Sequence, residues 1–304
     1  MTDKSDTAGL GRVTVKATNV YVNTGGSVAL GLAAASASDT VNVQAGVYTD
    51  GAVTVNTAGI TANSEAGVSG FSFVLGSANT LTLAGAGDVN ANGNAGINTL
   101  AGSSGINTLN GLAGADTITG GDAADTINGG NDNDNLTSNA GADTVNGGTG
   151  IDTANYAISY VGAITGSSTL LVDGDTVSNV ELLAFTDATV AIVGRGGSEY
   201  TTLNATNLLV SSTTKFWGTL AINSSTFTTA TQLDALTARF VAGSTVTVDT
   251  TGMNSTQLAA VAANPTTSAV VIYPPVQVVS GSTITGYFTT IQAGINFATV
   301  RAST

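Results

Sequence analysis

An aliphatic side chain returns at every ninth position across the middle of the chain. The members of this aliphatic series are Leu100, Leu109, Ile118, Ile127, Leu136, Val145 and Ala154. A strand with one inward aliphatic residue and a glycine-rich turn cannot bury its apolar side alone, whereas stacked copies can. The period therefore predicts a mainly β fold, a parallel β-solenoid in which one nonapeptide forms half a coil and two successive nonapeptides form a full coil.

An oxygen-bearing side chain stands two residues before each member of the series. An 18-residue spacing aligns Asn98, Asp116, Asp134 and Asp152 in one column and Asn107, Asp125 and Asp143 in another. Stacked carboxylates repel one another in a low-dielectric groove unless a cation lies between successive turns. Ca²⁺ suits this position because it accepts carboxylates and backbone carbonyls in flexible geometry. The predicted calcium sites also include the glycines that open the turns: Gly111, Gly120, Gly129 and Gly147.

The charge distribution agrees with a cation site and excludes several partners. All seven Lys and Arg residues lie outside residues 17–194, and this window contains 15 of the 20 acidic residues. Nucleic acids and anionic membrane surfaces need clustered basic side chains, so neither is an expected partner. The chain has no Cys and no His, which leaves oxygen as the metal ligand and removes the commonest general base. No apolar run is long enough to insert across a bilayer.

Three nonapeptides carry a family resemblance: GGDAADTIN, GGNDNDNLT and GGTGIDTAN. They resemble the Gly-Gly-x-Gly-x-Asp-x-aliphatic-x repeat of RTX proteins, in register over residues 93–155. The resemblance implies a calcium-loaded parallel β-roll. The departures are Asn98 and Asn107 in place of Asp, Ser138-Asn139 in place of Gly-Gly, and Asp132 at a glycine position. We therefore expect weaker ion binding at the start of the roll, and a metal-free Gly/Asn solenoid is the alternative.

The regions that flank the roll have other patterns. Residues 1–90 contain an apolar helical stretch before Val41-Asn42-Val43 and resemble the start of a right-handed β-helix of the pectate-lyase type, where a cap helix precedes the first coil. Residues 158–200, with Val180-Glu181 before Phe185, resemble the segment that closes RTX rolls. TNLLV, TQLDAL and TQLAAV recur at a fixed interval, beginning at Thr206, Thr231 and Thr256, and each precedes an extended run. This recurrence predicts a small α/β solenoid, with two chance αβ units as the alternative.

The expected fold class is thus mainly β, a right-handed parallel β-solenoid with a β-helix start, a calcium β-roll and an α/β solenoid. The expected domains are a β-helix-like segment at 1–90, the roll at 91–157, its closing segment at 158–200, the α/β solenoid at 201–275 and the start of a further β-helix-like unit at 276–304.

Catalysis is not expected, because a polysaccharide lyase of the β-helix type needs a basic residue to abstract a proton and the acidic window has none. We expect a calcium-stabilised secreted structural protein, part of a bacterial surface layer or an extracellular filament. The alternatives are a calcium-dependent adhesin that binds a cell-surface glycan, an ice-binding solenoid and a polysaccharide-active β-helix. Ice binding would use the threonines that flank the aliphatic series: Thr99, Thr108, Thr117, Thr126, Thr144 and Thr153.

The two ends of the chain suggest export and self-association. The start, MTDKSDTAGLGR, lacks the pattern of a cleavable signal peptide, and RTX proteins typically leave by type I secretion, so we expect export in an unfolded state. The final stretch, TITGYFTTIQAGINFATVRAST, resembles the N-terminal start unit. Head-to-tail stacking of this tail on the next subunit would bury Phe288, Ile291, Ile295 and Phe297. A truncated piece of a longer repeat array is the alternative.

Overall fold

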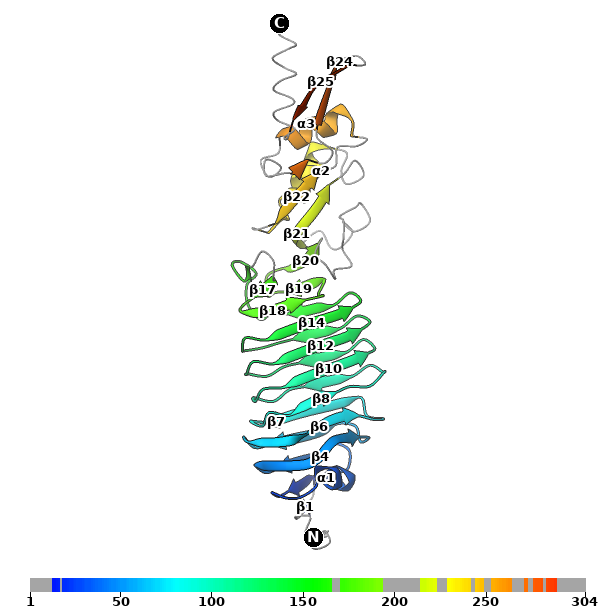
Figure 1. The fold of residues 1–304 in the computed structure, drawn as a ribbon, viewed down its shortest axis with the longest axis vertical. Coiled ribbons are helices and arrows are strands. Elements are labelled where there is room, and N and C mark those ends of the chain that lie inside the picture. The colour runs from blue at the N-terminus through cyan, green and yellow to red at the C-terminus, as the bar shows by residue number, and fades with distance from the viewer. Residues whose placement is uncertain are drawn as a thin grey trace. The chain divides into compact units, whose positions relative to one another are not determined.

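Short strands stack coil upon coil through the first part of the chain and alternate between two sheets (Figure 1). This computed structural model describes residues 13–16, 18–165, 170–193, 214–222, 229–241, 244–248, 253–263, 271–272, 276–280 and 283–288. Its contacts divide the chain into two compact units, Met1–Asp187 and Ala188–Thr304, and each unit is described by itself. The stacked parallel strands of the first unit confirm the predicted β-solenoid.

The strands of the first unit form sheet A and sheet B. Sheet A has the order β1 (Val13–Lys16), β2 (Asn19–Val22), β3 (Thr40–Val43), β5 (Ile60–Ser64), β7 (Thr80–Gly85), β9 (Thr99–Ala101), β11 (Thr117–Thr119), β13 (Asn135–Thr137), β15 (Thr153–Asn155) and β19 (Leu182–Ala184). Sheet B has the order β4 (Gly46–Val55), β6 (Val68–Leu75), β8 (Asn90–Asn92), β10 (Thr108–Ala113), β12 (Thr126–Asn131), β14 (Thr144–Thr149), β18 (Asp175–Ser178), β17 (Leu170–Val172) and β16 (Ile164–Thr165). Among the described strands of this unit, pairing is antiparallel only at β1–β2 and among β16, β17 and β18.

The coil length changes along this unit. Val20, Val41, Ala62 and Leu83 are in register in successive coils, and aromatic rings fill these wider coils, with the Phe71 ring centroid 5.2 Å from that of Phe73. From β9 onward, strands of the roll pair at the shorter interval of two nonapeptides, as Leu100 does with Ile118. All seven members of the aliphatic series are at most 2% exposed, so the predicted core of the roll is confirmed.

Helix α1 (Val28–Ala34) packs against β1 to β4 in the first unit. The Ser27 hydroxyl oxygen accepts the N–H of Leu30 as an N-cap and donates to the carboxylate of Asp50. Val28 and Leu32 are buried. The helix stands where the sequence predicted a cap helix, and the relation to β-helices of the pectate-lyase type stays a prediction.

The second unit alternates strands with helices. Its parallel strands are β20 (Thr189–Val193), β21 (Lys215–Ile222), β22 (Thr245–Val248) and β23 (Val271–Ile272). Helix α2 (Ala230–Thr237) follows β21, and α3 (Ser255–Ala263) follows β22. The register joins Leu220 to Val246 and Val248 to Ile272, close to the interval predicted from the three Thr-initiated segments. The N-cap of α2 is Thr229, in a capping box with Gln232, just before the TQLDAL segment.

The strands β24 (Val276–Ser280) and β25 (Thr283–Phe288) form an antiparallel hairpin. The TNLLV segment and most of the predicted tail contact, including Ile291, Ile295 and Phe297, lie outside the described residues. The predicted domain boundaries stay predictions. None of the helices in the described part of the chain is long and apolar enough to cross a membrane.

Candidate metal centre

The predicted column residues are buried at the two edges where the chain passes from one sheet to the other. Asn98, Asp116, Asp134 and Asp152 precede strands of sheet A and form the first column, whereas Asn107, Asp125 and Asp143 precede strands of sheet B and form the second column. Each of the seven side chains is at most 3% exposed. Acidic side chains are rarely buried so completely unless they are paired or bind a metal.

Each column is held by hydrogen bonds between neighbouring coils. In the first column, the backbone N–H of Asn98 donates to Oδ1 of Asp116 at 2.7 Å, and the N–H of Asp116 donates to Oδ1 of Asp134 at 2.8 Å. Asp134 donates in the same way to Asp152. In the second column, Asn107 donates to Asp125, and Asp125 donates to Asp143. One oxygen of every column carboxylate is therefore fixed by the preceding coil.

The other oxygen of four column carboxylates has no partner. Oδ2 of Asp116, Asp134, Asp143 and Asp152 is buried without a hydrogen bond. Asp125 differs, because its Oδ2 accepts the N–H of Gly121 at 2.6 Å. A buried, unpaired carboxylate oxygen costs free energy, so these four positions require a proton or a cation.

Burial raises the pKa of all five column aspartates. For Asp134, burial acts together with the charges of Asp152 and Asp116, against the stabilising backbone hydrogen bond, and raises the pKa from 3.8 to about 7. For Asp143, burial and the charge of Asp175 raise the pKa to about 6. A divalent cation beside these groups would favour the charged carboxylate and oppose this shift.

Carbonyl oxygens line the same spaces as the unpaired carboxylate oxygens. A Cβ atom on Gly111 would lie 2.3 Å from Oδ2 of Asp116 and 2.5 Å from the carbonyl oxygen of Gly129. On Gly129 it would lie 2.2 Å from Oδ2 of Asp134 and 2.5 Å from the carbonyl oxygen of Gly147. Glycine thus keeps this space open, and a carboxylate with a neighbouring carbonyl is a donor set that fits Ca²⁺.

The remaining predicted glycines have related surroundings. A Cβ on Gly120 would lie 2.8 Å from Oδ2 of Asp125 and 2.6 Å from the carbonyl of Ser138, and one on Gly147 would lie 2.4 Å from Oδ2 of Asp152. Within the described ranges, no three Asp, Glu, His or Cys side chains gather at one point. An ion between two turns would therefore need carbonyl or water oxygens besides its carboxylates.

The two asparagine repeats satisfy their side chains with protein partners. Oδ1 of Asn107 accepts the N–H of Ser103 at 2.7 Å, and its Nδ2 donates to the carbonyl of Val89 at 2.7 Å. Oδ1 of Asn98 accepts the N–H of Asn94, and its Nδ2 donates to the Asn94 side chain. These positions contain no unpaired oxygen, in line with the expected weaker ion binding at the start of the roll.

Sequence reasoning missed two column members in the coil that follows the last repeat. This closing coil contains β18 and β19. The N–H of Asp143 donates to Oδ1 of Asp175 at 2.9 Å, and the N–H of Asp152 donates to Oε2 of Glu181 at 2.9 Å. The triplet Asp175-Thr176-Val177 repeats Asp143-Thr144-Val145, and this repetition could have identified Asp175. The 18-residue spacing could not, because 32 residues separate Asp175 from Asp143.

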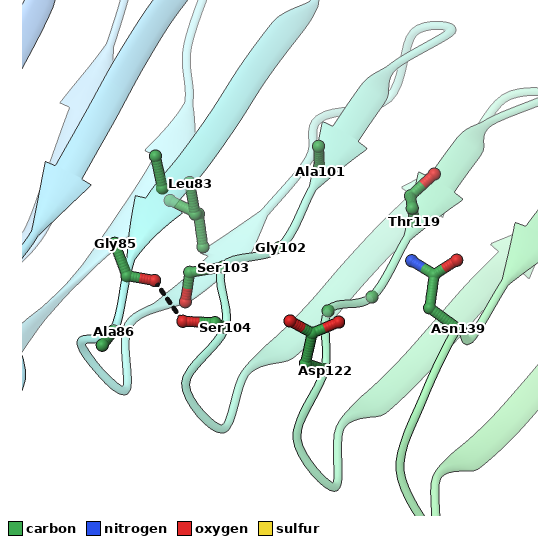
Figure 2. A pocket seen from close by; sticks show the side chains of 13 residues that line it. Leu83, Gly85, Ala86, Ala101, Gly102, Ser103, Ser104, Thr119, Asp122 and Asn139 are labelled. Atoms are coloured by element: carbon green, nitrogen blue, oxygen red, sulfur yellow. Dashed lines mark hydrogen bonds between the residues drawn. The ribbon is translucent and has the colours of Figure 1, made fainter.

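The lining of an open hollow of about 690 Å³ includes Ser103 and Gly121, whose N–H groups donate to Asn107 and Asp125 of the second column. Figure 2 shows the residues that line this hollow. Its polar lining includes Ser104, Asp122 and Asn139, and the Ser104 hydroxyl donates to the carbonyl of Gly85 at 2.8 Å. Asp122 is the only ionisable side chain in this lining. A single carboxylate does not make the acid and base pair of a glycosidase, and we assign no chemistry to the hollow.

Comparison with known families agrees with this geometry. Residues 92–127 and 119–154 match the family described as RTX calcium-binding nonapeptide repeat (4 copies). Searches of curated proteins and of solved structures find no relative of this chain. The matched residues are the stacked 18-residue coils with the buried columns, and the cofactor of this family is Ca²⁺. Residues 92–154 of the chain therefore form a calcium-binding parallel β-roll of RTX nonapeptide repeats.

Proposed function

We propose that this chain is a secreted structural protein whose roll is completed by calcium outside the cell. The observation that carries the proposal is the set of four buried carboxylate oxygens without partners, in a unit whose acidic window contains no Lys or Arg. Burial without a counter-charge is unfavourable, and bound Ca²⁺ supplies that charge.

The ions would lie between successive members of each column. The three carboxylate pairs inside the repeats are Asp116 with Asp134, Asp134 with Asp152, and Asp125 with Asp143. Carbonyl oxygens of Gly129, Gly147 and Ser138 stand beside them. With weaker sites that reach Asn98 and Asn107, roughly three to five ions are expected in all.

Calcium dependence gives a reason for export in an unfolded state. The unfolded chain has no preformed site, so the free energy of ion binding contributes to folding. At low calcium concentration the acidic roll would remain open and could pass a narrow export channel, and it would fold on meeting calcium outside. Type I secretion, a route typical of proteins with these repeats, would suit this order of events.

We further propose that the protein assembles into a surface layer or a filament. This assembly is supported by the resemblance between the tail and the N-terminal start unit, and by the exposed edge that any solenoid presents at its end. A head-to-tail contact does not close on itself and yields filaments or sheets. If deletion of residues 284–304 leaves the assembly seen by electron microscopy unchanged, the tail is not the connector.

The calcium step has a direct test. Circular dichroism and thermal melting of the full chain are compared in calcium and after EGTA, and calorimetry counts the ions. The proposal requires loss of strand signal and a lower melting temperature after EGTA, both restored by added calcium. An unchanged spectrum and melting curve would refute it.

Ice binding is a second candidate function, favoured by the outer face of sheet A. One lateral ladder of side chains contains Thr61, Thr82, Thr119 and Thr137 and is interrupted by Ala101. A second ladder contains Thr80, Thr99, Thr117 and Thr153 and is interrupted by Asn135. The strands β5 to β15 of this sheet carry no charged side chain. Neighbouring rungs are about 4.8 Å apart, so the hydroxyl groups could order water. The test is thermal hysteresis of the protein. Ice binding would be supported if T117Y, on sheet A, abolished the hysteresis and T126Y, on sheet B, preserved it.

A further inference from the structure

The first column continues beyond the residues that match the repeat family. Glu181 lies well past the end of the match at residue 154, yet its Oε2 accepts the N–H of Asp152, as Asp152 accepts that of Asp134. Glu181 is 1% exposed. The Asp152 side chain is fully buried, and its Oδ2 has no partner. The last aspartate of the repeats therefore faces the closing coil with an unsatisfied oxygen.

A carbonyl oxygen of the closing coil completes the same donor set as in the repeats. A Cβ on Gly147 would lie 2.0 Å from the carbonyl of Asn179 and 2.4 Å from Oδ2 of Asp152. The Asn179 carbonyl thus stands where the Gly147 carbonyl stands one coil earlier and the Gly129 carbonyl two coils earlier. In a repeat, the aspartate follows the carbonyl residue by five positions, as in Gly147 and Asp152, whereas Glu181 follows Asn179 by two. The left-handed φ of 48° at Asn179 and the longer glutamate side chain compensate for this shorter loop.

The second column continues in a parallel way. Oδ1 of Asp175 accepts the N–H of Asp143, and Oδ2 of Asp143 has no partner although its residue is 1% exposed. The hydroxyl of Tyr156 is buried next to the side chains of Ser138 and Asp175. The Tyr156 ring stacks on Phe185 with 5.6 Å between centroids, so the hydroxyl is held in place.

We propose that the closing coil supplies Ca²⁺ ligands of its own, with Glu181 and the Asn179 carbonyl facing Asp152 and with Asp175 facing Asp143. This proposal rests on the proposed function, because it extends the same columns. It adds two ions to those held between repeats. It also gives calcium a further role, which is to attach β18 and β19 to the last repeat and so cover the end of the roll.

Calcium calorimetry on full-length variants tests the proposal. E181Q and D175N keep an acceptor oxygen for the backbone N–H and remove the charge. The matched controls are E65Q, whose Oε2 also accepts a backbone N–H but is exposed, and D122N, an exposed aspartate of the repeats. Each column variant should bind one ion fewer than its control, and the double variant two fewer. Unchanged ion counts in folded E181Q and D175N would overturn the inference.

A second measurement separates this inference from the proposed function. D134N removes a carboxylate that belongs only to the repeats, so it should lower the ion count whether or not the closing coil binds calcium. If D134N loses ions while E181Q and D175N do not, the inference alone fails. If the unmodified chain binds no calcium, both fail.

Terbium luminescence provides a local probe of the second column. Tb³⁺ replaces Ca²⁺ and emits when a nearby tyrosine is excited. Because Tyr156 is buried beside Asp175, Y156F should remove most of the tyrosine-sensitised emission, and D175N should reduce it severalfold. Y48F, in the wider coils, should leave it unchanged. Emission that survives in both Y156F and D175N would exclude an ion at Asp175.

Discussion

The first two repeats of the roll and the later ones share one backbone path but differ in how the column side chain is satisfied. Asn107 donates from its amide to the Val89 carbonyl and accepts from Ser103, so every polar group of its side chain has a protein partner. Asp134 accepts one N–H from Asp116 and leaves its second oxygen buried and unpaired. At the column position, an amide therefore has all its polar groups hydrogen-bonded within the protein, whereas a carboxylate needs a bound cation.

This difference indicates where the calcium dependence of the fold resides. The coils before the roll have wider cores filled by side chains such as Phe73 and Leu83, and their stability comes from apolar burial. The repeats from Asp116 onward contribute one aliphatic residue per strand and bury a charge beside it. Metal binding is the expected source of the missing stability there.

Removal of calcium by chelation should give the largest difference in stability between the wider coils and the later repeats. At free calcium of 100 times Kd, each independent site stabilises the folded roll by about 2.7 kcal/mol, and EGTA removes this contribution from every site at once. Hydrogen exchange should then become fast in residues 108–155, whereas residues 40–83 should keep their protection. Equal loss of protection in both regions, or in neither, would show that the two regions do not differ in calcium dependence.

D134N should have the next largest effect, because Asp134 belongs to two carboxylate pairs. We expect a loss of about 3 kcal/mol of calcium-dependent stabilisation, comparable to at least one site, measured by urea denaturation in calcium. Without calcium the variant should be no less stable than the parent, since an amide needs no counter-charge. D122N removes an exposed charge and is the control. A drop in calcium-free stability as large as the drop in calcium would contradict this reading of Asp134.

The sequence predicted the roll well because its period and its chemistry agree. The inward series from Leu100 to Ala154 depends on the two-residue alternation of strands, and the columns depend on the 18-residue coil, so both follow from spacing alone. Spacing also placed threonines outward, but it did not separate Thr117, on sheet A, from Thr126, on sheet B. The sheet to which each threonine belongs is known only from the folded coil, in which successive repeats alternate between sheet A and sheet B.

The limits of prediction lie where the spacing changes. Glu181 and Asp175 join the columns 29 and 32 residues after their partners, because β16 and β17 are inserted as antiparallel strands. The unpaired Oδ2 atoms could not be predicted either. They depend on whether the N–H four residues earlier is available, as it is from Gly121 to Asp125. That detail is set by the three-dimensional turn rather than by residue type.

The stability of the calcium-free protein should depend on pH through the buried carboxylates of the later repeats. The pKa of Asp134 is raised to about 7 and that of Asp143 to about 6 in the folded state. The folded state therefore binds more protons than the unfolded state between about pH 4 and pH 7, and stability falls as pH rises through this window. We expect a decrease on the order of 2 kcal/mol, measured by denaturation at pH 5 and pH 8. In saturating calcium the slope should reverse, because protons compete with the ion. D134N, D143N and their double variant should flatten the calcium-free slope, and a slope that persists in the double variant would assign it to other groups.

The smallest effect should come from N107D, which introduces a column carboxylate, as found in the later repeats, into one of the first two repeats. The new carboxylate would lose the hydrogen bond to the Val89 carbonyl and would face that oxygen with a negative charge, so the calcium-free roll should be destabilised by about 1 kcal/mol. In calcium the same substitution should create a carboxylate pair with Asp125 and strengthen the weak site there, so calorimetry should count one more tightly bound ion. N110D is the matched control, because it introduces the same charge into the Asn92–Asn110–Asn128 ladder of half-buried side chains away from the columns. If N107D and N110D bind equal numbers of ions, a carboxylate in the column is not sufficient to form a site, and the contrast between the two parts of the roll must lie in the backbone of the turn.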